Sequence, residues 1–143
     1  MGEFDDNRRF SLTKTEAIRS ISRVEEKTTT LPIKVEKPWG YEIIIAWTER
    51  YVGKILFIRS GHSLSLQYHK IKDETIYVVS GAMDFEVEED GGMKTRKLGP
   101  GNPYHIRPGV KHRMRAVEDC TIFEVSTPEL DDVVRLQDLY GRT

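Results

Sequence analysis

The chain has very little cysteine, no excess of charge of either sign and no long hydrophobic run. Cys120 is its only cysteine, which excludes an intrachain disulfide and a cysteine-rich zinc module. Lys and Arg number 22 against 23 Asp and Glu, a net charge of −1 that excludes a strongly basic nucleic-acid-binding protein. No apolar run approaches the roughly 20 residues of a membrane-spanning helix, and the N-terminus has no apolar signal-peptide segment. We therefore expect a cytoplasmic protein that binds neither nucleic acid nor membrane.

Glycine and proline are absent between residues 3 and 31, whereas all six prolines come later. This change of composition predicts an N-terminal arm over residues 1–31 and a single folded domain over residues 32–143. Thr13 and Glu16 form a capping-box pattern, and apolar residues follow at three-residue spacing, so a short amphipathic helix is predicted over residues 14–26. We interpret the arm as a packing or dimer-swapping element rather than a catalytic one.

The domain reads as a series of short β-strands separated by turn signals, rich in Val, Ile, Tyr and Phe. This density of short strands favours an all-β antiparallel sandwich or barrel over alternating β–α units. A short closing helix is predicted over Asp131–Tyr140, with carboxylates at its start and Gly141 after its end. The predicted strands are Tyr41–Trp47, Tyr51–Arg59, Ser63–His69, Glu74–Ser80, Ala82–Glu89, Lys94–Leu98, Tyr104–Arg107, Lys111–Ala116 and Thr121–Ser126.

One predicted strand carries polar side chains on one face and apolar side chains on the other. Because side chains alternate along a strand, Ser63, Ser65, Gln67 and His69 share a face, and the opposite face is apolar. Such a strand suits a barrel whose interior holds a polar site. A lone histidine on a strand is more often a hydrogen-bonded structural residue, so this pattern gains weight only in combination with others.

The four histidines all lie between residues 62 and 112, close to an amide and a carboxylate that can share a metal ion with them. Gln67, His69, Glu74 and His112 supply one amide oxygen, two imidazoles and one carboxylate. Zinc, manganese and iron accept such nitrogen and oxygen ligands, and an open site would add water or substrate oxygens.

The spacing of these residues resembles the paired motifs of the cupin superfamily. The first motif is Gly61-x5-Gln67-x-His69-x4-Glu74-x6-Gly81, and the second is Gly101-x7-Gly109-x2-His112. Most cupins have His where Gln67 stands and Pro where Arg107 stands. A Gln-x-His, Glu and His ligand set is similar to that of the phosphomannose isomerases.

Within the superfamily, the chain resembles the stand-alone or C-terminal cupin of type II mannose-6-phosphate isomerases over about residues 35–142. The segments that carry this resemblance are Lys37–Glu42, Leu64–Gln67, Gly109–Arg113 and Val134–Arg142. It implies a double-stranded β-helix, the cupin jelly-roll barrel, flanked here by the N-terminal arm and the C-terminal helix. It also implies one divalent metal ion per subunit, with zinc as the first choice and manganese, iron or nickel as alternatives.

The resemblance implies aldose–ketose isomerisation of a sugar or sugar phosphate, in which a metal ion holds two oxygens while a proton moves between adjacent carbons. Lys72 or His105 is expected to assist proton transfer, with His62 as a further candidate, while Lys54 and Arg107 are expected to hold an anionic end of the substrate. Ser63 and Lys72 stand where this isomerase group commonly has Arg, which weakens a bidentate phosphate contact. The nucleotidyltransferase half of the bifunctional relatives is not in this sequence, so GDP-mannose synthesis is not expected.

Other functions remain open at this stage. A non-catalytic sugar- or metabolite-binding cupin is the main alternative, and the serine at position 63 favours it. A metal-dependent oxygenase is a weaker one, because such cupins more often use three histidines and a carboxylate, and a metal-free deoxysugar epimerase is weaker still. Lys54–Ile58 is apolar on both faces apart from its lysine, so the outside of this strand needs a cover. A second subunit is the simplest cover, since the cupin resemblance implies homodimers, and the N-terminal helix competes with it.

Overall fold

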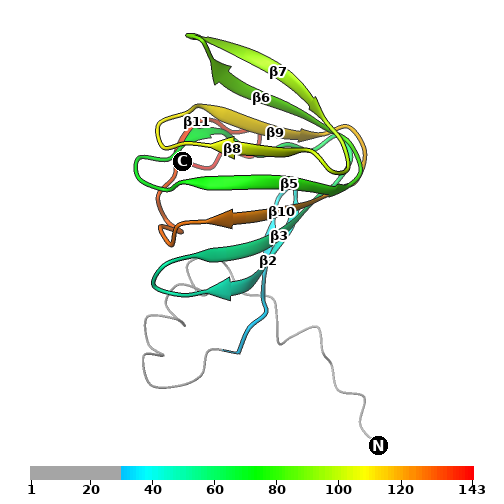
Figure 1. The fold of residues 1–143 in the computed structure, drawn as a ribbon. Coiled ribbons are helices and arrows are strands. Elements are labelled where there is room, and N and C mark those ends of the chain that lie inside the picture. Colours follow the sequence, from blue (N-terminus) through cyan, green and yellow to red (C-terminus); the bar gives the residue numbers. More distant parts are fainter. Residues whose placement is uncertain (1–29) are drawn as a thin grey trace, which may run out of the picture.

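Two antiparallel β-sheets face each other around a shared interior (Figure 1). The computed structural model describes residues 30–143. One sheet has six strands in the order β1-β2-β3-β10-β5-β8, and the other has five in the order β11-β4-β9-β6-β7. The strands are β1 (Ile33–Lys37), β2 (Gly40–Trp47), β3 (Val52–Ile58), β4 (Leu66–Tyr68), β5 (Glu74–Ser80), β6 (Met83–Glu89), β7 (Gly92–Leu98), β8 (Pro103–Ile106), β9 (His112–Ala116), β10 (Cys120–Ser126) and β11 (Val134–Gln137).

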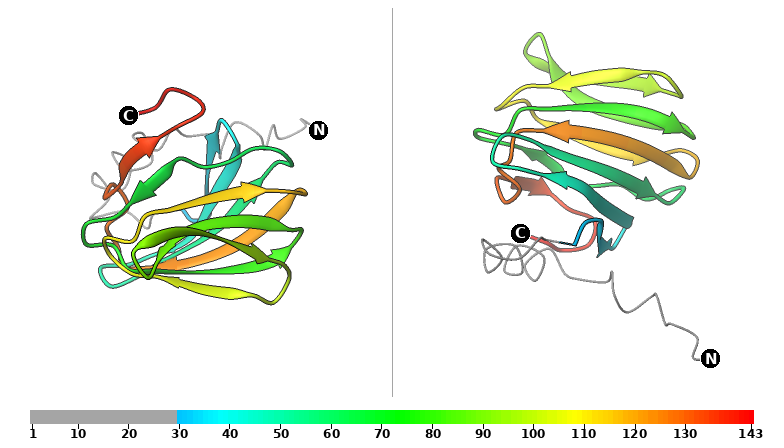
Figure 2. Two further views of the ribbon diagram at one scale, coloured as in Figure 1. Left: turned by 90° about the horizontal axis from the view of Figure 1, so that it is seen from above. Right: turned by 60° about the horizontal axis from the view of Figure 1, so that its bottom comes forward.

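The two sheets lie one over the other (Figure 2), and the side chains that alternate inward along each strand build the core between them. In β6, Met83, Phe85 and Val87 are fully buried, while the residues between them are half-buried. The inward positions of β10 follow the same rule, so that Ile122 lies in the core and Glu124 follows it on the same face. Burial of such apolar side chains contributes about 1.5–3 kcal/mol each. The core therefore fixes which residues point inward, including the charged ones.

The turn between β5 and β6 requires the glycine of the first motif. Gly81 has a φ of +84°, and a Cβ at this position would lie 2.1 Å from the carbonyl oxygen of Asp119. Only glycine combines this left-handed conformation with such a close backbone approach. Gly81 therefore ends β5 and lets β6 enter the opposite sheet.

The all-β antiparallel architecture predicted from the sequence is confirmed, and every predicted strand is present with shifted ends except β5, whose ends match. The closing helix over Asp131–Tyr140 is wrong, because β11 forms there and pairs with β4, with Val134 opposite Tyr68. The strand β1 was not predicted. The predicted helix over residues 14–26 lies outside the described residues, and the boundary at residue 31 stays a prediction. Within residues 30–143 there is no helix long and apolar enough to cross a membrane.

The outer face of the six-stranded sheet is uncharged across its four central strands. Ile43, Ile55, Phe123 and Tyr77 lie opposite one another on β2, β3, β10 and β5, and together they form an apolar row. The remaining outward positions of these strands are also uncharged: Tyr41, Ile45, Ala46, Gly53, Phe57, Thr75, Val79, Thr121 and Val125. We call this set of residues the outer apolar face.

Candidate metal centre and cavity

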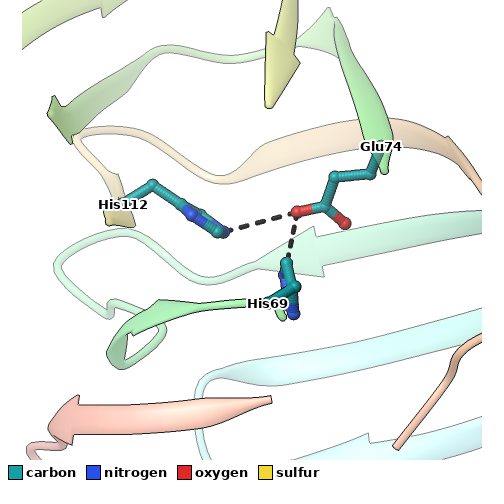
Figure 3. A group of neighbouring side chains, drawn as sticks. All are labelled: His69, Glu74 and His112. Carbon is teal, nitrogen blue, oxygen red and sulfur yellow. Dashed lines mark hydrogen bonds and ion pairs between the residues drawn. The ribbon is translucent and has the colours of Figure 1, made fainter. Parts of the chain in front are cut away.

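Three of the four predicted metal ligands meet inside the fold (Figure 3). His69 follows β4, Glu74 begins β5 and His112 begins β9. Glu74 Oε1 lies 3.1 Å from Nε2 of His69 and 3.3 Å from Nε2 of His112. One ligand atom from each residue lies within 4.8 Å of the other two, and all three side chains are buried. The structure thus brings together residues that are up to 43 positions apart in the sequence.

Hydrogen bonds from the far side of each ring select the tautomer of both histidines. Nδ1 of His112 donates to the backbone carbonyl of Val110 at 2.9 Å, and Nδ1 of His69 donates to the carbonyl of Asp132. A carbonyl only accepts, so Nδ1 carries the proton and Nε2 of a neutral ring presents a lone pair.

Both lone pairs then point at a carboxylate oxygen, which is repulsive. His112 Nε2 is in addition a buried atom without a hydrogen-bond partner. A divalent cation among the three ligand atoms would remove this repulsion without charging two buried imidazoles. The donor set therefore fits a metal ion.

Gln67, the fourth predicted ligand, lies beside this cluster. It is opposite His112 in the β4–β9 pair, so both side chains are on the same face of the sheet. Its Oε1 accepts a hydrogen bond from Ser65 Oγ at 2.8 Å, which orients the amide. Gln67 and His69 both line an internal cavity.

The cavity contains a row of buried charges that alternate in sign. Lys54 Nζ lies 3.4 Å from Glu42 Oε2 and 4.0 Å from Glu124 Oε2. Lys72 Nζ continues the row, 3.5 Å from Glu124 Oε2 and 2.9 Å from Glu74 Oε2. We call Glu42, Lys54, Glu124, Lys72 and Glu74 the buried ion row, and it runs directly to the metal cluster.

The charges in the buried ion row shift one another's pKa values. Burial alone would lower the pKa of Lys72, but Glu124 and Glu74 outweigh it and raise that pKa above its usual value. Burial would raise the pKa of Glu74, but Lys72 and the two histidines hold it well below its usual range. For Glu124, burial and the nearby Glu74 raise the pKa.

Further cations line the cavity: Lys37, Arg135 and Arg142 border it together with Lys54. Burial lowers the pKa of Lys37, and repulsion from Lys54 and the two arginines adds to this, although Glu42, 3.8 Å from Lys37 Nζ, acts in the opposite direction. Burial and repulsion from Arg142 likewise lower the pKa of Arg135, whose Nε is buried without a hydrogen-bond partner. We call Lys37, Lys54, Arg135 and Arg142 the cation cluster, and its mutual repulsion would be relieved by a bound anion.

Of the other predicted site residues, some line the cavity and some lie outside it. Lys54 and Lys72 line the cavity as expected. His105 does not, because the inward position of β8 is taken by Ile106; the His105 side chain is 48% exposed and lies 2.7 Å from Asp73. His105 instead lines a groove beside the outer apolar face, and its role in proton transfer stays a prediction that its position does not support.

Arg107 and His62 also lie outside the cavity. Arg107 is exposed in the turn that follows β8 and does not line the cavity, so its contact with the anionic end of a substrate stays a prediction that its position does not support. His62 bonds through Nδ1 to the hydroxyl of Tyr140 at 2.8 Å and does not line the cavity either. Lys72 is left as the one predicted proton-transfer residue that borders it.

Several cavity residues were missed by the sequence analysis, although signals for two of them existed. Glu124 has the same parity as Ile122 in β10, and Glu42 has the same parity as Ile44 in β2, so both were inward positions. Arg135 could not be placed while its segment was interpreted as a helix. Its position follows only from the pairing of β11 with β4.

Two facing antiparallel sheets around a polar cavity, with the paired motifs on neighbouring strands, define a cupin. Solved cupins of this fold include KdgF from Halomonas sp., with 24% identity and a TM-score of 0.62 over 71% of this chain and 96% of that one. Oxalate decarboxylase from Bacillus subtilis has 17% identity and a TM-score of 0.64 over 84% of this chain and 36% of that one. At these identities the likeness concerns the fold alone.

The chain belongs to the family described as mannose-6-phosphate isomerase C-terminal, whose profile matches residues 24–138. The xanthan biosynthesis protein XanB of Xanthomonas campestris pv. campestris is 31% identical over 90% of this chain and 28% of its own length. Mannose-1-phosphate guanylyltransferase ManC of Salmonella typhimurium is 30% identical over 88% of this chain and 28% of its own. The chain thus spans about a quarter of the length of these relatives. The resemblance inferred from the motifs is confirmed, and the chain is a sugar-related cupin domain.

Proposed function

We propose that this cupin holds one divalent metal ion and catalyses aldose–ketose isomerisation of a sugar phosphate. The observation that carries the proposal is the convergence of His69, Glu74 and His112 on one point beside a cavity whose charged lining has more cations than carboxylates. Gln67 is proposed as the fourth ligand. When bound, zinc or another divalent ion would act as a Lewis acid on the two oxygens that exchange carbonyl and hydroxyl character.

The cation cluster supports a phosphorylated substrate over a neutral sugar. The charged residues that line the cavity include five cations, Lys37, Lys54, Lys72, Arg135 and Arg142, but among carboxylates only Glu42 and Glu124. Arg135 and Arg142 supply planar donors that suit phosphate oxygens, and Arg142 is oriented by two hydrogen bonds from its guanidinium to Asp138. The cavity itself has a volume of about 50 Å³ and opens to solvent, so a hexose phosphate would extend out of it.

Lys72 supports the isomerisation step itself. Its ammonium is buried at the metal end of the cavity, 2.9 Å from Glu74. Isomerisation passes through an enediol whose oxygens gain negative charge, and a fixed positive charge there stabilises that charge in a medium of low dielectric constant. We assign to Lys72 this electrostatic role.

The proposal is tested by exchange of substrate protons with solvent. Mannose 6-phosphate and fructose 6-phosphate are incubated in D₂O with zinc-loaded protein, and proton NMR follows the C2 signal of the aldose and the C1 signals of the ketose. The wild type and His105→Ala should exchange these protons at similar rates, whereas His112→Ala should fall to background. Tight binding of either sugar phosphate without any exchange would contradict isomerisation.

Recognition of the phosphate by the cation cluster is tested by replacing one cavity arginine and, as a control, one exposed arginine. Arg135→Gln should weaken binding of the sugar phosphate about tenfold or more, because a hydrogen bond to a charged group is worth about 1.5–3 kcal/mol. Arg115→Gln removes an exposed arginine and should leave binding unchanged. Equal affinities of the two variants would contradict a phosphate site in the cation cluster.

A non-catalytic sugar-phosphate-binding cupin is the second candidate. It is favoured by Ser63, which is 1% exposed and offers no cation where the isomerase group commonly has an arginine. Both candidates share the cavity and the metal centre. Binding without solvent exchange is the result that selects this alternative.

We further propose that the protein is a homodimer formed through the outer apolar face. A groove over this face is lined by Ile45, Tyr51, Phe123 and Val125. The outer apolar face has no charged side chain of its own, and the charges that border it are Lys34, 4.4 Å over the Tyr41 ring, and Arg50 and Asp73 in the groove. Its centre can therefore meet an identical copy across a two-fold axis without like-charge repulsion. Exposed apolar surface of this extent on a folded domain marks an interaction site.

A further inference from the structure

The loop between β4 and β5 connects two of the metal ligands and is held by one acidic side chain. The carboxylate of Asp132 accepts hydrogen bonds from three consecutive backbone amides of this loop. Oδ1 accepts from the amide of Lys70 at 3.0 Å, and Oδ2 accepts from those of Ile71 at 2.6 Å and Lys72 at 2.9 Å. The loop begins at His69 and ends at Glu74, so these bonds lie between two ligands.

Apolar packing does not hold this loop in place, because Ile71, its one apolar residue, is 66% exposed and Lys70 is exposed as well. One further anchor is the buried side chain of Lys72, which pairs with Glu74 and Glu124. The others are hydrogen bonds at the two ends of the loop: the amide of Gly109 donates to the carbonyl of His69 at 2.6 Å, and the amide of Asp73 donates to Thr127 Oγ1 at 3.0 Å. Between these ends the Asp132 carboxylate is the only side chain in residues 30–143 that bonds to the loop amides.

The backbone of Asp132 acts on the metal cluster directly. Its carbonyl accepts the hydrogen bond from Nδ1 of His69 that leaves Nε2 free as a ligand atom. Asp132 therefore fixes His69 through its main chain and the loop beyond it through its side chain. One residue thus sets the orientation of a ligand and its distance from the next one.

We propose that Asp132 is a positioning residue of the metal centre, which it preorganises by clamping the loop from His69 to Glu74. This inference rests on the metal site of the proposed function but not on the reaction. Without the clamp, metal binding would have to order residues 70–73, and the lost conformational entropy would weaken the affinity. Ordering one loop residue costs about 1–2 kcal/mol, which is roughly a tenfold loss of affinity.

The test compares zinc affinities by competition with a chromophoric chelator. Asp132→Ala removes all three hydrogen bonds but keeps the main-chain carbonyl that bonds His69, and it should raise the Kd for zinc about 100-fold, the cost of ordering about two loop residues. Asp132→Asn keeps one carbonyl oxygen, so it can satisfy one side of the clamp and should raise the Kd by roughly tenfold. Asp131→Asn is the matched control, because Asp131 is exposed and its carboxylate makes no hydrogen bond or ion pair within residues 30–143.

Two further measurements separate positioning from a general loss of structure. Unfolding of the metal-free variants by urea reports their stability. In folded variants, the visible absorption spectrum of bound Co²⁺ reports the ligand geometry, and hydrogen exchange reports the amides of Lys70, Ile71 and Lys72. We expect Asp132→Asn to stay folded, to exchange these amides faster and to bind Co²⁺ with an altered spectrum.

The outcomes distinguish the two proposals. If the wild type binds no stoichiometric zinc, the metal site of the proposed function is wrong. If the wild type binds zinc and both Asp132 variants match Asp131→Asn in affinity and spectrum, the positioning role of Asp132 is wrong while the metal site stands.

Discussion

The buried ion row makes a quantitative prediction about Lys72. Its Nζ lies 2.9 Å from Glu74 and 3.5 Å from Glu124, and the three side chains are 6%, 1% and 6% exposed. Lys72→Met keeps the length of the side chain but leaves two buried carboxylates without their shared cation. Removal of one partner from a buried ion pair destabilises a protein by about 3–5 kcal/mol. For a chain of this size the loss corresponds to a fall in Tm of roughly 10 °C.

The assay is urea unfolding at pH 7 with EDTA present, so that metal binding does not contribute. Lys97→Met is the matched control, because Lys97 is 88% exposed and lies 3.5 Å from Asp84, an ion pair worth at most about 1 kcal/mol. Adding Glu124→Gln to Lys72→Met removes one of the two stranded charges and should recover part of the stability. If Lys72→Met loses no more stability than Lys97→Met, the buried ion row does not stabilise the fold as argued.

Three further predictions follow from other parts of the structure. Hydrogen bonds from Arg142 hold the pKa of Asp138 below its usual range, so as the pH falls the unfolded chain binds a proton at Asp138 before the folded protein does. The free energy of unfolding should therefore fall as the pH drops below about 4. In urea unfolding at several pH values, Asp138→Asn should reduce this dependence on pH, and an unchanged dependence would contradict the argument. Val125→Glu on the outer apolar face should convert a dimer to a monomer, as measured by the mass from light scattering. Val117→Glu, which changes a similarly exposed valine in the β9–β10 turn, should leave the dimer intact. Equal masses for the two variants would argue against this interface. Burial raises the pKa of the Cys120 thiol to about 11, so the thiol should react with a disulfide reagent at pH 8 only after the protein unfolds. Rapid labelling of the folded protein would contradict the interpretation of Cys120 as an inert core thiol.

The convergence of His69, Glu74 and His112 could be predicted from the sequence because their spacing matches the paired cupin motifs. Glu74 begins a strand whose predicted and observed ends agree, and His69 and Glu74 are separated by one short loop. Alternation along β10 also places Glu124 inside, because it is two residues after the buried Ile122. In β8 the same alternation places His105 outside, because the neighbouring Ile106 points inward.

The C-terminal segment could not be predicted because its partners are distant in the sequence. Asp131 and Asp132 look like residues at a helix start, where carboxylates accept bonds from the first free amides. Asp132 does accept such bonds, but from amides of the β4–β5 loop rather than from its own segment. Pairing of β11 with β4 then satisfies the backbone as a strand, and this tertiary contact overrides the local helix signal.

The clamp formed by Asp132 has a consequence for the order in which the protein matures. Its hydrogen bonds join residues 60 to 63 positions apart in the sequence. During synthesis, all four proposed ligands have been made once His112 has emerged, but the loop that spaces two of them stays loose until residue 132 follows. The nascent chain therefore passes through a stage at which the donor atoms have been synthesised but the proposed metal site is not yet ordered. On this proposal, metal would bind after this stage, to the folded protein, and would not assist the assembly of the sheets.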